Sequence, residues 1–156
     1  MKIVLFANTD WYLFNFRLTY IKYLLRKGHN VFLVCPSGKY INLLIDSGCK
    51  HLHVPFSRRG MNPLIEFITF LRLMLIINII KPDILHNFTL KCVIYGTFAA
   101  KCAHFNRVVN AIAGLGFIFS SAEYLAQILR PIVQFLMKFL LNSGAVIFQN
   151  PDDLYN

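Results

Sequence analysis

Residues 2–35 read KIVLFANTDWYLFNFRLTYIKYLLRKGHNVFLVC and contain the pattern that decides the fold. The run Lys2–Ala7 is apolar after its first residue, as is typical of a parallel strand buried on both faces. Leu18–Lys27 has apolar residues at helical spacing and a basic last turn, and Gly28 follows it as a helix C-cap would. Asn30–Cys35 is a second apolar run. The segment therefore predicts a strand, an amphipathic helix and a second strand.

The same alternation continues along the chain. Further strands are predicted at His51–Phe56, Asp83–His86, Arg107–Ile112 and Gly144–Phe148. Further helices are predicted at Tyr40–Ser47, Pro63–Ile80, Leu90–His104 and Glu123–Asn142. Strands that alternate with helices through short connections form a parallel sheet with helices on both faces. The sequence therefore predicts one α/β domain over residues 1–156, with a doubly wound, mostly parallel sheet of about six strands.

The composition is unusually apolar and basic. Hydrophobic residues make up 56% of the 156 residues, which excludes a disordered chain, and 16 basic against 7 acidic residues give a net charge of +9. This combination favours contact with an anionic, partly apolar surface. The basic residues follow no nucleic-acid-binding motif, so no nucleic-acid partner is expected. The 4 cysteines lack CxxC spacing, and no metal site is expected.

Two long apolar segments, Pro63–Ile80 and Tyr124–Leu141, raise the question of a membrane span. Charged residues interrupt both before about 20 apolar residues accumulate, so we expect helices that are covered on most sides. A polar stripe on the second segment is formed by Gln127, Arg130, Gln134 and Lys138. Two interpretations of that helix remain open, namely burial against the sheet or insertion at a membrane interface. The amino terminus lacks a signal-peptide cleavage site, which favours a cytoplasmic protein.

Parallel sheets of this kind bind ligands outside the carboxyl ends of their strands. The residues that follow the predicted strands include Asn8, Thr9, Asp10, Trp11, Arg58, Arg59, Asn87, Thr89, Lys91, Gly114 and Gly116. The turn after the first strand has no glycine, so the GxGxxG fingerprint of nicotinamide and flavin enzymes is missing. The P-loop motif is missing too, which excludes the corresponding NTPases. The aromatic residues around Trp11 can form a platform for a sugar or lipid, or a hydrophobic staple.

Three other features at this edge have both a functional and a structural interpretation. Arg58 and Arg59 can hold phosphate oxygens through guanidinium contacts, or be solvated charges or lipid-headgroup contacts. His86 can polarise a hydroxyl or hold a phosphate, or be a hydrogen-bonded core residue. Gly114 and Gly116 can bring backbone N–H groups to a diphosphate, or form a tight turn.

Six stretches together match a known family. They are FANTDWYLFNFRL at 6–18, PSGKY at 36–40, SRRGMNPL at 57–64, HNFTLKCVIYGTFAA at 86–100, RVVNAIAGLGFIF at 107–119 and VIFQNPDD at 146–153. On these stretches the sequence resembles the amino-terminal half of bacterial family 4 glycosyltransferases, which extend lipid-linked sugars in capsule, O-antigen and glycan assembly. The resemblance implies a GT-B architecture of two facing Rossmann-like domains, with the acceptor held mainly by the first and the nucleotide-sugar donor mainly by the second. It also implies a retaining transfer from a nucleotide-diphosphate sugar such as a UDP-sugar, without a metal or other cofactor.

Carried over by position, the resemblance implies roles for residues at the carboxyl edge. His86 would be the catalytic residue. The acceptor would contact Asn8, Thr9, Trp11, Asn15, Arg58, Arg59, Thr89, Lys91 and Asn110, and the diphosphate would lie near Gly114 and Gly116.

The family's donor-binding domain lies carboxy-terminal to the region matched here. We therefore expect this domain to be absent from the chain and the chain alone to be inactive. An alternative is a non-catalytic acceptor subunit that recruits a membrane and works with a separate donor-binding polypeptide. The expected partners are a nucleotide sugar, a lipid-linked glycan acceptor, the missing donor-binding domain or subunit, and the inner face of the cell membrane, on which this cytoplasmic chain would be peripheral.

Overall fold

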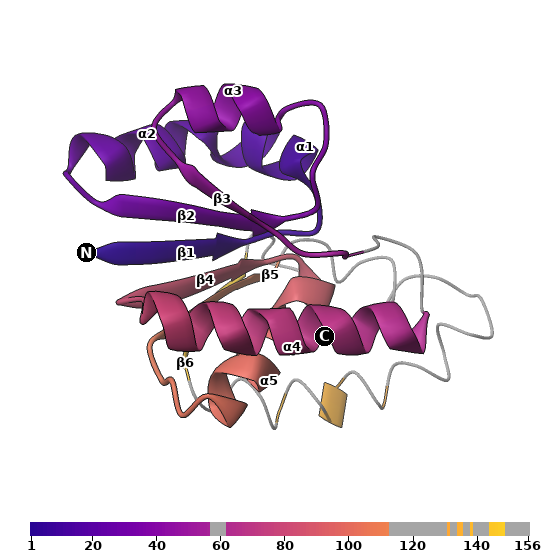
Figure 1. Cartoon of the computed structure of the whole chain (residues 1–156). Coiled ribbons are helices and arrows are strands. Elements are labelled where there is room, and N and C mark those ends of the chain that lie inside the picture. The colour runs from indigo at the N-terminus through magenta and orange to yellow at the C-terminus, as the bar shows by residue number, and fades with distance from the viewer. Residues whose placement is uncertain (57–61, 113–130, 132–133, 136–137, 139–143, 149–156) are drawn as a thin grey trace.

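The computed structural model of the chain describes residues 1–56, 62–112, 131, 134–135, 138 and 144–148 (Figure 1). Its strands are β1 (Lys2–Phe6), β2 (Asn30–Cys35), β3 (Lys50–His53), β4 (Ile84–Phe88), β5 (Val108–Ile112) and β6 (Gly144–Phe148). They form one sheet in the order β3-β2-β1-β4-β5-β6, and every neighbouring pair is parallel. The predicted α/β fold with a six-stranded parallel sheet is confirmed.

Helices cover both faces of this sheet (Figure 1). They are α1 (Asp10–Tyr12), the π-helical segment η1 (Leu13–Arg17), α2 (Leu18–Arg26), α3 (Ile41–Asp46), α4 (Pro63–Ile80) and α5 (Leu90–Cys102). α2 and α3 cover the face that contains Leu5 and Leu33, and α4 and α5 cover the face that contains Val4 and Val34. Successive strand residues point to opposite faces, so burial of both faces explains why the strands are continuously apolar.

The predicted helix start at residue 18 agrees with α2, but α1 and η1 precede it and were not predicted. α1 begins at Asp10, because the Thr9 hydroxyl accepts a hydrogen bond from the Tyr12 N–H at 3.1 Å and caps it. The predicted ends of two strands are wrong. β3 ends at His53 rather than at residue 56, because Pro55 lacks the N–H that a ladder needs. β4 continues for two residues beyond His86, which places the imidazole inside the strand.

The start of α4 agrees with the prediction, but its burial does not. The Asn62 side chain accepts a hydrogen bond from the Leu64 N–H at 3.0 Å, and Pro63 occupies the first position of the helix. The expectation that this helix is covered on most sides is wrong, since only Thr69, Leu73 and Ile77 are fully buried. A helix that is apolar around its circumference can bury only one side against a sheet. By length and hydropathy alone, α4 could cross a membrane, a criterion that core helices of soluble proteins also meet.

The polar stripe predicted on the last long helix falls partly within the described residues. Pro131, Gln134, Phe135 and Lys138 are helical and exposed, with Phe135 at 71%. Gln127 and Arg130 lie outside the described residues.

Candidate functional site

Asp10 fixes the first turn at the carboxyl edge of the sheet. Its carboxylate is buried and accepts hydrogen bonds from the Trp11 N–H at 2.8 Å and from the Tyr40 N–H at 2.7 Å. Gly38 packs directly against this carboxylate, where a Cβ would collide with it. Asp10 therefore joins the turn after β1 to the turn after β2. Sequence reasoning placed Asp10 at this edge without assigning it a role.

An exposed aromatic pair joins α1 and η1. The rings of Trp11 and Phe16 lie edge to face with centroids 5.3 Å apart, and their side chains are 44% and 58% exposed. Asn15 is exposed, and its side-chain amide donates a hydrogen bond to the Trp11 carbonyl at 2.8 Å. A hydrophobic staple would bury such rings, so their exposure favours the platform interpretation. Asn8 is half-buried just before this segment.

His86 lies in an aromatic cluster on the α2 side of the sheet. Its ring packs on Phe88 with centroids 4.2 Å apart and meets the edge of Tyr20 at 5.7 Å. The Arg17 guanidinium lies 4.8 Å from the centroid of Phe88 and donates a hydrogen bond to the Tyr12 hydroxyl at 2.7 Å. Neither Arg17 nor Tyr20 was predicted as a site residue, although both share one helical face and Arg17 is the only basic residue of its turn.

The surroundings of His86 keep its imidazole neutral. Burial disfavours the charged form, and the nearby Arg17 cation adds to this, so the pKa of His86 is lowered from 6.5 to about 4. Burial also raises the pKa of Tyr20, whose hydroxyl lies 3.4 Å from His86 Nδ1.

Two polar atoms of this cluster have no hydrogen-bond partner among the described residues. They are His86 Nε2 and Arg17 Nε, and both are buried. Buried polar atoms are normally paired, because an unpaired group loses its hydration without compensation. His86 lies two residues before the carboxyl end of β4, and ligands bind at this end of such sheets, so this cluster is the best candidate contact for a ligand.

The opposite side of β4 contains a buried amide cluster. The Asn87 side chain donates a hydrogen bond to Asn110 Oδ1 at 2.8 Å, and the Thr97 hydroxyl donates to the same oxygen at 3.1 Å. Asn110, predicted as an acceptor contact, is completely buried here. Gly96 leaves room for Asn87, since a Cβ at this position would collide with the amide.

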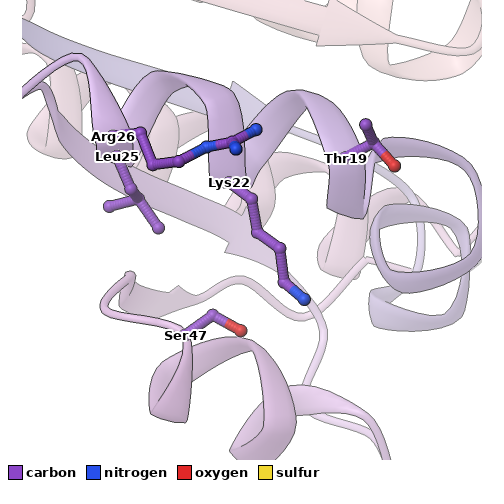
Figure 2. Close-up of a pocket in the computed structure, with 5 residues that line it drawn as sticks. All are labelled: Thr19, Lys22, Leu25, Arg26 and Ser47. Atoms are coloured by element: carbon purple, nitrogen blue, oxygen red, sulfur yellow. The ribbon is translucent and has the colours of Figure 1, made fainter.

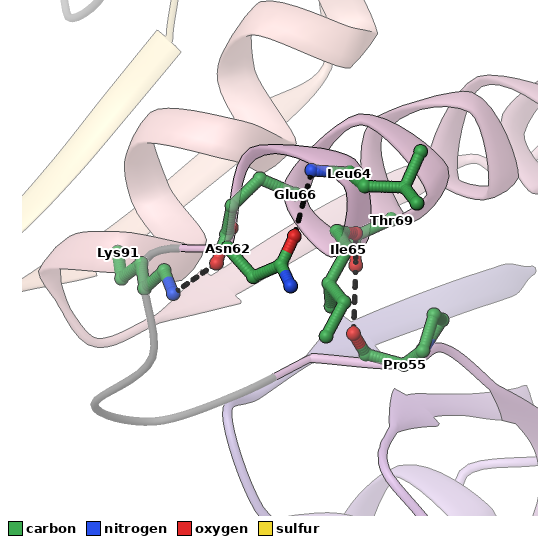
Figure 3. A network of polar contacts seen from close by, with 7 residues as sticks. All are labelled: Pro55, Asn62, Leu64, Ile65, Glu66, Thr69 and Lys91. Atoms are coloured by element: carbon green, nitrogen blue, oxygen red, sulfur yellow. Dashed lines mark hydrogen bonds and ion pairs between the residues drawn. The ribbon is translucent and has the colours of Figure 1, made fainter.

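Lys91 points to the α4 side of the sheet and forms an ion pair. Its Nζ atom lies 2.6 Å from Glu66 Oε1 (Figure 3). The same atom lies 4.6 Å from the centroid of Phe56. Burial and the same carboxylate raise the pKa of Tyr95 to about 12. Glu66 was not predicted as a site residue, although it is the single acidic residue of a mostly apolar helix.

The junction between β4 and α5 has an unusual backbone. Thr89 adopts a φ of 73°, in the region that favours glycine, and its hydroxyl lies beside the Cys92 thiol. A β-branched residue in this conformation is strained, which is common at functional sites. Arg58, Arg59, Gly114 and Gly116 lie outside the described residues.

Other features of the described residues lie away from this edge. A pocket of about 340 Å³ between α2 and α3 is lined by Thr19, Lys22, Leu25, Arg26 and Ser47 (Figure 2). It contains none of the predicted site residues. Among the residues that the structure describes, no group of three His, Cys, Asp or Glu side chains could hold a metal ion.

Comparison with known proteins was made for both sequence and structure. The family described as glycosyl transferase 4-like matches residues 2–150. N,N'-diacetylbacillosaminyl-diphospho-undecaprenol alpha-1,3-N-acetylgalactosaminyltransferase from Campylobacter jejuni is 26% identical over 138 residues, which are 88% of this chain and 37% of that enzyme.

Solved structures share the fold at low sequence identity. MurG from Acinetobacter baumannii has a TM-score of 0.62 and 17% identity over 97% of this chain and 41% of its own. A glycosyltransferase from Rickettsia africae has a TM-score of 0.58 and 14% identity over 99% of this chain and 47% of its own. The UDP-GlcNAc 2-epimerase from Methanocaldococcus jannaschii has a TM-score of 0.56 and 16% identity over 94% and 45%. Because transferases and epimerases both occur, these structures show the fold alone, and the chain spans less than half the length of each of these proteins.

Proposed function

Because the chain belongs to the glycosyl transferase 4-like family, we propose that it is the acceptor-binding part of a retaining glycosyltransferase. The donor is a nucleotide-diphosphate sugar, a UDP-sugar, and the acceptor is a lipid-linked or polysaccharide glycan. The family match supports the reaction, because it extends over residues 2–150. The Campylobacter jejuni relative supports the acceptor class, because its name specifies a diphospho-undecaprenol substrate.

The single observation on which the role of this edge rests is the buried Nε2 atom of His86. It has no hydrogen-bond partner among the described residues, and His86 lies two residues before the carboxyl end of β4, the end at which sheets of this kind bind ligands. An acceptor hydroxyl or phosphate oxygen would supply the missing partner.

The neutral imidazole limits what His86 can do. With a pKa of about 4, the imidazole is uncharged at neutral pH and is a weak base. Its role is therefore to orient the acceptor through a hydrogen bond while the exposed Trp11–Phe16 pair stacks on a sugar ring. Charge that develops on the diphosphate is stabilised by groups of the donor-binding domain, without a metal ion.

Complete turnover requires a donor-binding domain or subunit. The matched region is 37% of the Campylobacter jejuni relative, and we propose that the groups that bind the nucleotide belong to the remaining part of such an enzyme. Residues 1–156 then bind the acceptor, and transfer requires the donor-binding groups as well. A lipid-linked acceptor places the reaction at the inner face of the cell membrane.

The proposal can be tested by binding to the chain itself. A water-soluble prenyl-diphosphate-linked monosaccharide is titrated while the imidazole resonances of His86 are followed by NMR. We expect these resonances to shift, and His86→Gln to weaken binding by about tenfold because a hydrogen bond to a buried partner is lost. A UDP-sugar is expected to leave the resonances unchanged.

Lys22→Gln is the matched control, because Lys22 is exposed on α2 and lines the pocket of Figure 2 rather than the carboxyl edge. Its affinity for the acceptor analogue should equal that of the unmodified chain. If the UDP-sugar shifts the His86 resonances and the acceptor analogue does not, the assignment of this chain to the acceptor is wrong.

A further inference from the structure

The aromatic platform, as we call the exposed rings of Trp11 and Phe16, joins residues that are five positions apart. The hydrogen bond from Arg17 to the Tyr12 hydroxyl spans the same spacing. Residues five apart lie about 140° from each other around an α-helix, since it has 3.6 residues per turn. A π-helix, whose hydrogen bonds join residues five apart, brings them to one side. The platform therefore depends on the π-helical form of η1.

The turn between β2 and α3 supports this π-helical segment at two points. The Tyr40 N–H donates a hydrogen bond to Asp10 at 2.7 Å, and the Tyr40 ring stacks on Phe14 with centroids 4.8 Å apart. α1 and the beginning of α3 accordingly lie at the same end of the sheet (Figure 1). Both contacts leave the aromatic platform exposed. Because π-helical segments are rare and short, such support from a neighbouring turn is expected to matter for their form.

Asp10 joins the supporting turn to the first turn of the helix. One carboxylate oxygen accepts a hydrogen bond from the Trp11 N–H at 2.8 Å, and the other accepts the hydrogen bond from the Tyr40 N–H. The carboxylate is buried and forms no ion pair with any of the residues that the structure describes. Burial of an unpaired charge is costly, and charge-assisted hydrogen bonds offset part of that cost. An asparagine has one acceptor oxygen in place of two, so both hydrogen bonds require the carboxylate.

We propose that Asp10 is a positioning residue for acceptor binding, which holds Trp11 against Phe16 in the orientation that stacks on a sugar ring. The identity of the ligand rests on the proposed function, whereas the position of Trp11 rests on the contacts of Asp10 alone. Asp10 acts through Trp11 and touches no ligand, since both of its oxygens accept backbone hydrogen bonds.

Gly38 offers a second way to displace the same carboxylate. A Cβ at this position would collide with Asp10 Oδ1. The φ of Gly38 lies outside the left-handed region, so an alanine causes no backbone strain of its own there. Gly38→Ala should therefore reproduce the effect of Asp10→Asn without altering the carboxylate itself.

The first test needs no ligand. Trp11 is the single tryptophan of the sequence, so the tryptophan band in near-ultraviolet circular dichroism comes from this one ring. We expect Asp10→Asn and Gly38→Ala to lose most of this band while far-ultraviolet circular dichroism shows the fold retained. An unchanged band in the folded variants would overturn the proposal, whether or not the chain binds an acceptor. Loss of the whole fold in both variants would indicate a general structural role and equally overturn it.

The second test compares the prenyl-diphosphate-linked monosaccharide with the same prenyl diphosphate without its sugar. We expect Asp10→Asn to weaken binding of the sugar-bearing ligand by about tenfold, as Trp11→Ala does, because stacking on the sugar is lost in both. The ligand without sugar should bind to both variants as it does to the unmodified chain. Adding Asp10→Asn to Trp11→Ala should cause no further loss, because Asp10 acts only through that ring.

Additive losses in the double variant, or equal weakening of the two ligands, would overturn the positioning role. If neither ligand binds to the unmodified chain, the proposed function is wrong, and the tryptophan band still decides the role of Asp10.

Asp46→Asn is the matched control. Asp46 is an exposed carboxylate at the end of α3 opposite to Tyr40, so the same chemical change there should alter neither the tryptophan band nor the affinity for either ligand.

Discussion

The neutral imidazole of His86 makes the stability of the domain depend on pH. Its pKa is about 4 in the folded chain and 6.5 when exposed, so between these values the unfolded chain binds a proton that the folded chain does not. The free energy of unfolding should therefore fall as pH drops through this window, by about 3 kcal/mol in total. Urea unfolding of the chain and of His86→Gln, at about pH 7 and about pH 4, should show that this loss is larger in the unmodified chain.

Arg17→Gln serves as a control that keeps the imidazole. Burial is the larger cause of the low pKa of His86 and Arg17 the smaller, so this variant should retain most of the pH-dependent loss. Identical pH dependence in the unmodified chain and His86→Gln would show that His86 titrates as an exposed histidine and contradict its burial.

The sequence predicted which residues lie near the carboxyl edge, but not which side chains contact them. His86 was placed at the carboxyl edge because it ends a predicted strand, and Lys91 because it follows the same strand. Tyr20 was missed because its contact with His86 joins residues 66 positions apart, which helical periodicity does not report. Lys91 pairs with Glu66, 25 residues away, on a helix whose position was unknown from the sequence.

At the level of elements, the contact between α5 and β4 depends on a glycine. Alanine is ordinarily the better helix former by about 1 kcal/mol, but a Cβ at Gly96 would collide with the buried Asn87 amide. We expect Gly96→Ala to lower the free energy of unfolding by about 2 kcal/mol, because the overpacked contact must move. Urea unfolding measures the change.

The same substitution in an Asn87→Ala background is the control. With the amide removed, Gly96→Ala should be neutral or stabilise the helix, so the two changes should not be additive. Additive effects would mean that the helix does not approach the strand as closely as described.

Helix and strand boundaries that are marked by local sequence signals were predicted better than properties that depend on neighbouring elements in the fold. The Asn62 cap and Pro63 mark the start of α4 in the sequence, and the structure agrees. The start at Asp10 was missed because α1 has three residues and the π-helical segment after it departs from regular α-helical spacing. How little of α4 is buried depends on what lies beside it, and no local pattern contains that information.

At the scale of the whole molecule, the reactivity of the cysteine thiols tests the packing on both faces of the sheet. Cys35, Cys49 and Cys92 are buried, and Cys102 is exposed. Burial raises the pKa of Cys35 to about 12 and of Cys49 to about 11, and that of Cys92 is raised as well. Since the thiolate is the reactive form, brief treatment of the native chain with iodoacetamide should modify Cys102 alone, and unfolding in urea should allow all 4 to react. Mass spectrometry counts the adducts.

Cys102→Ser is the control, and this variant should acquire no adduct while native. An adduct at Cys92 in the native chain would contradict the packing of α5, and one at Cys35 would contradict that of the α2 layer.

The alternation of apolar runs and amphipathic segments was sufficient to predict the parallel sheet, because such runs are buried on both faces only in this class of fold. The order of the strands has a further consequence for synthesis. β1 pairs with β2 within the first 35 residues, but its other edge pairs with β4, which begins at residue 84. At translation rates of about 5–20 residues per second, the nascent chain carries an open central strand edge for seconds while the apolar α4 emerges from the ribosome. An exposed edge beside an apolar helix favours aggregation, so this chain is expected to need chaperone protection most between the synthesis of β2 and that of β4.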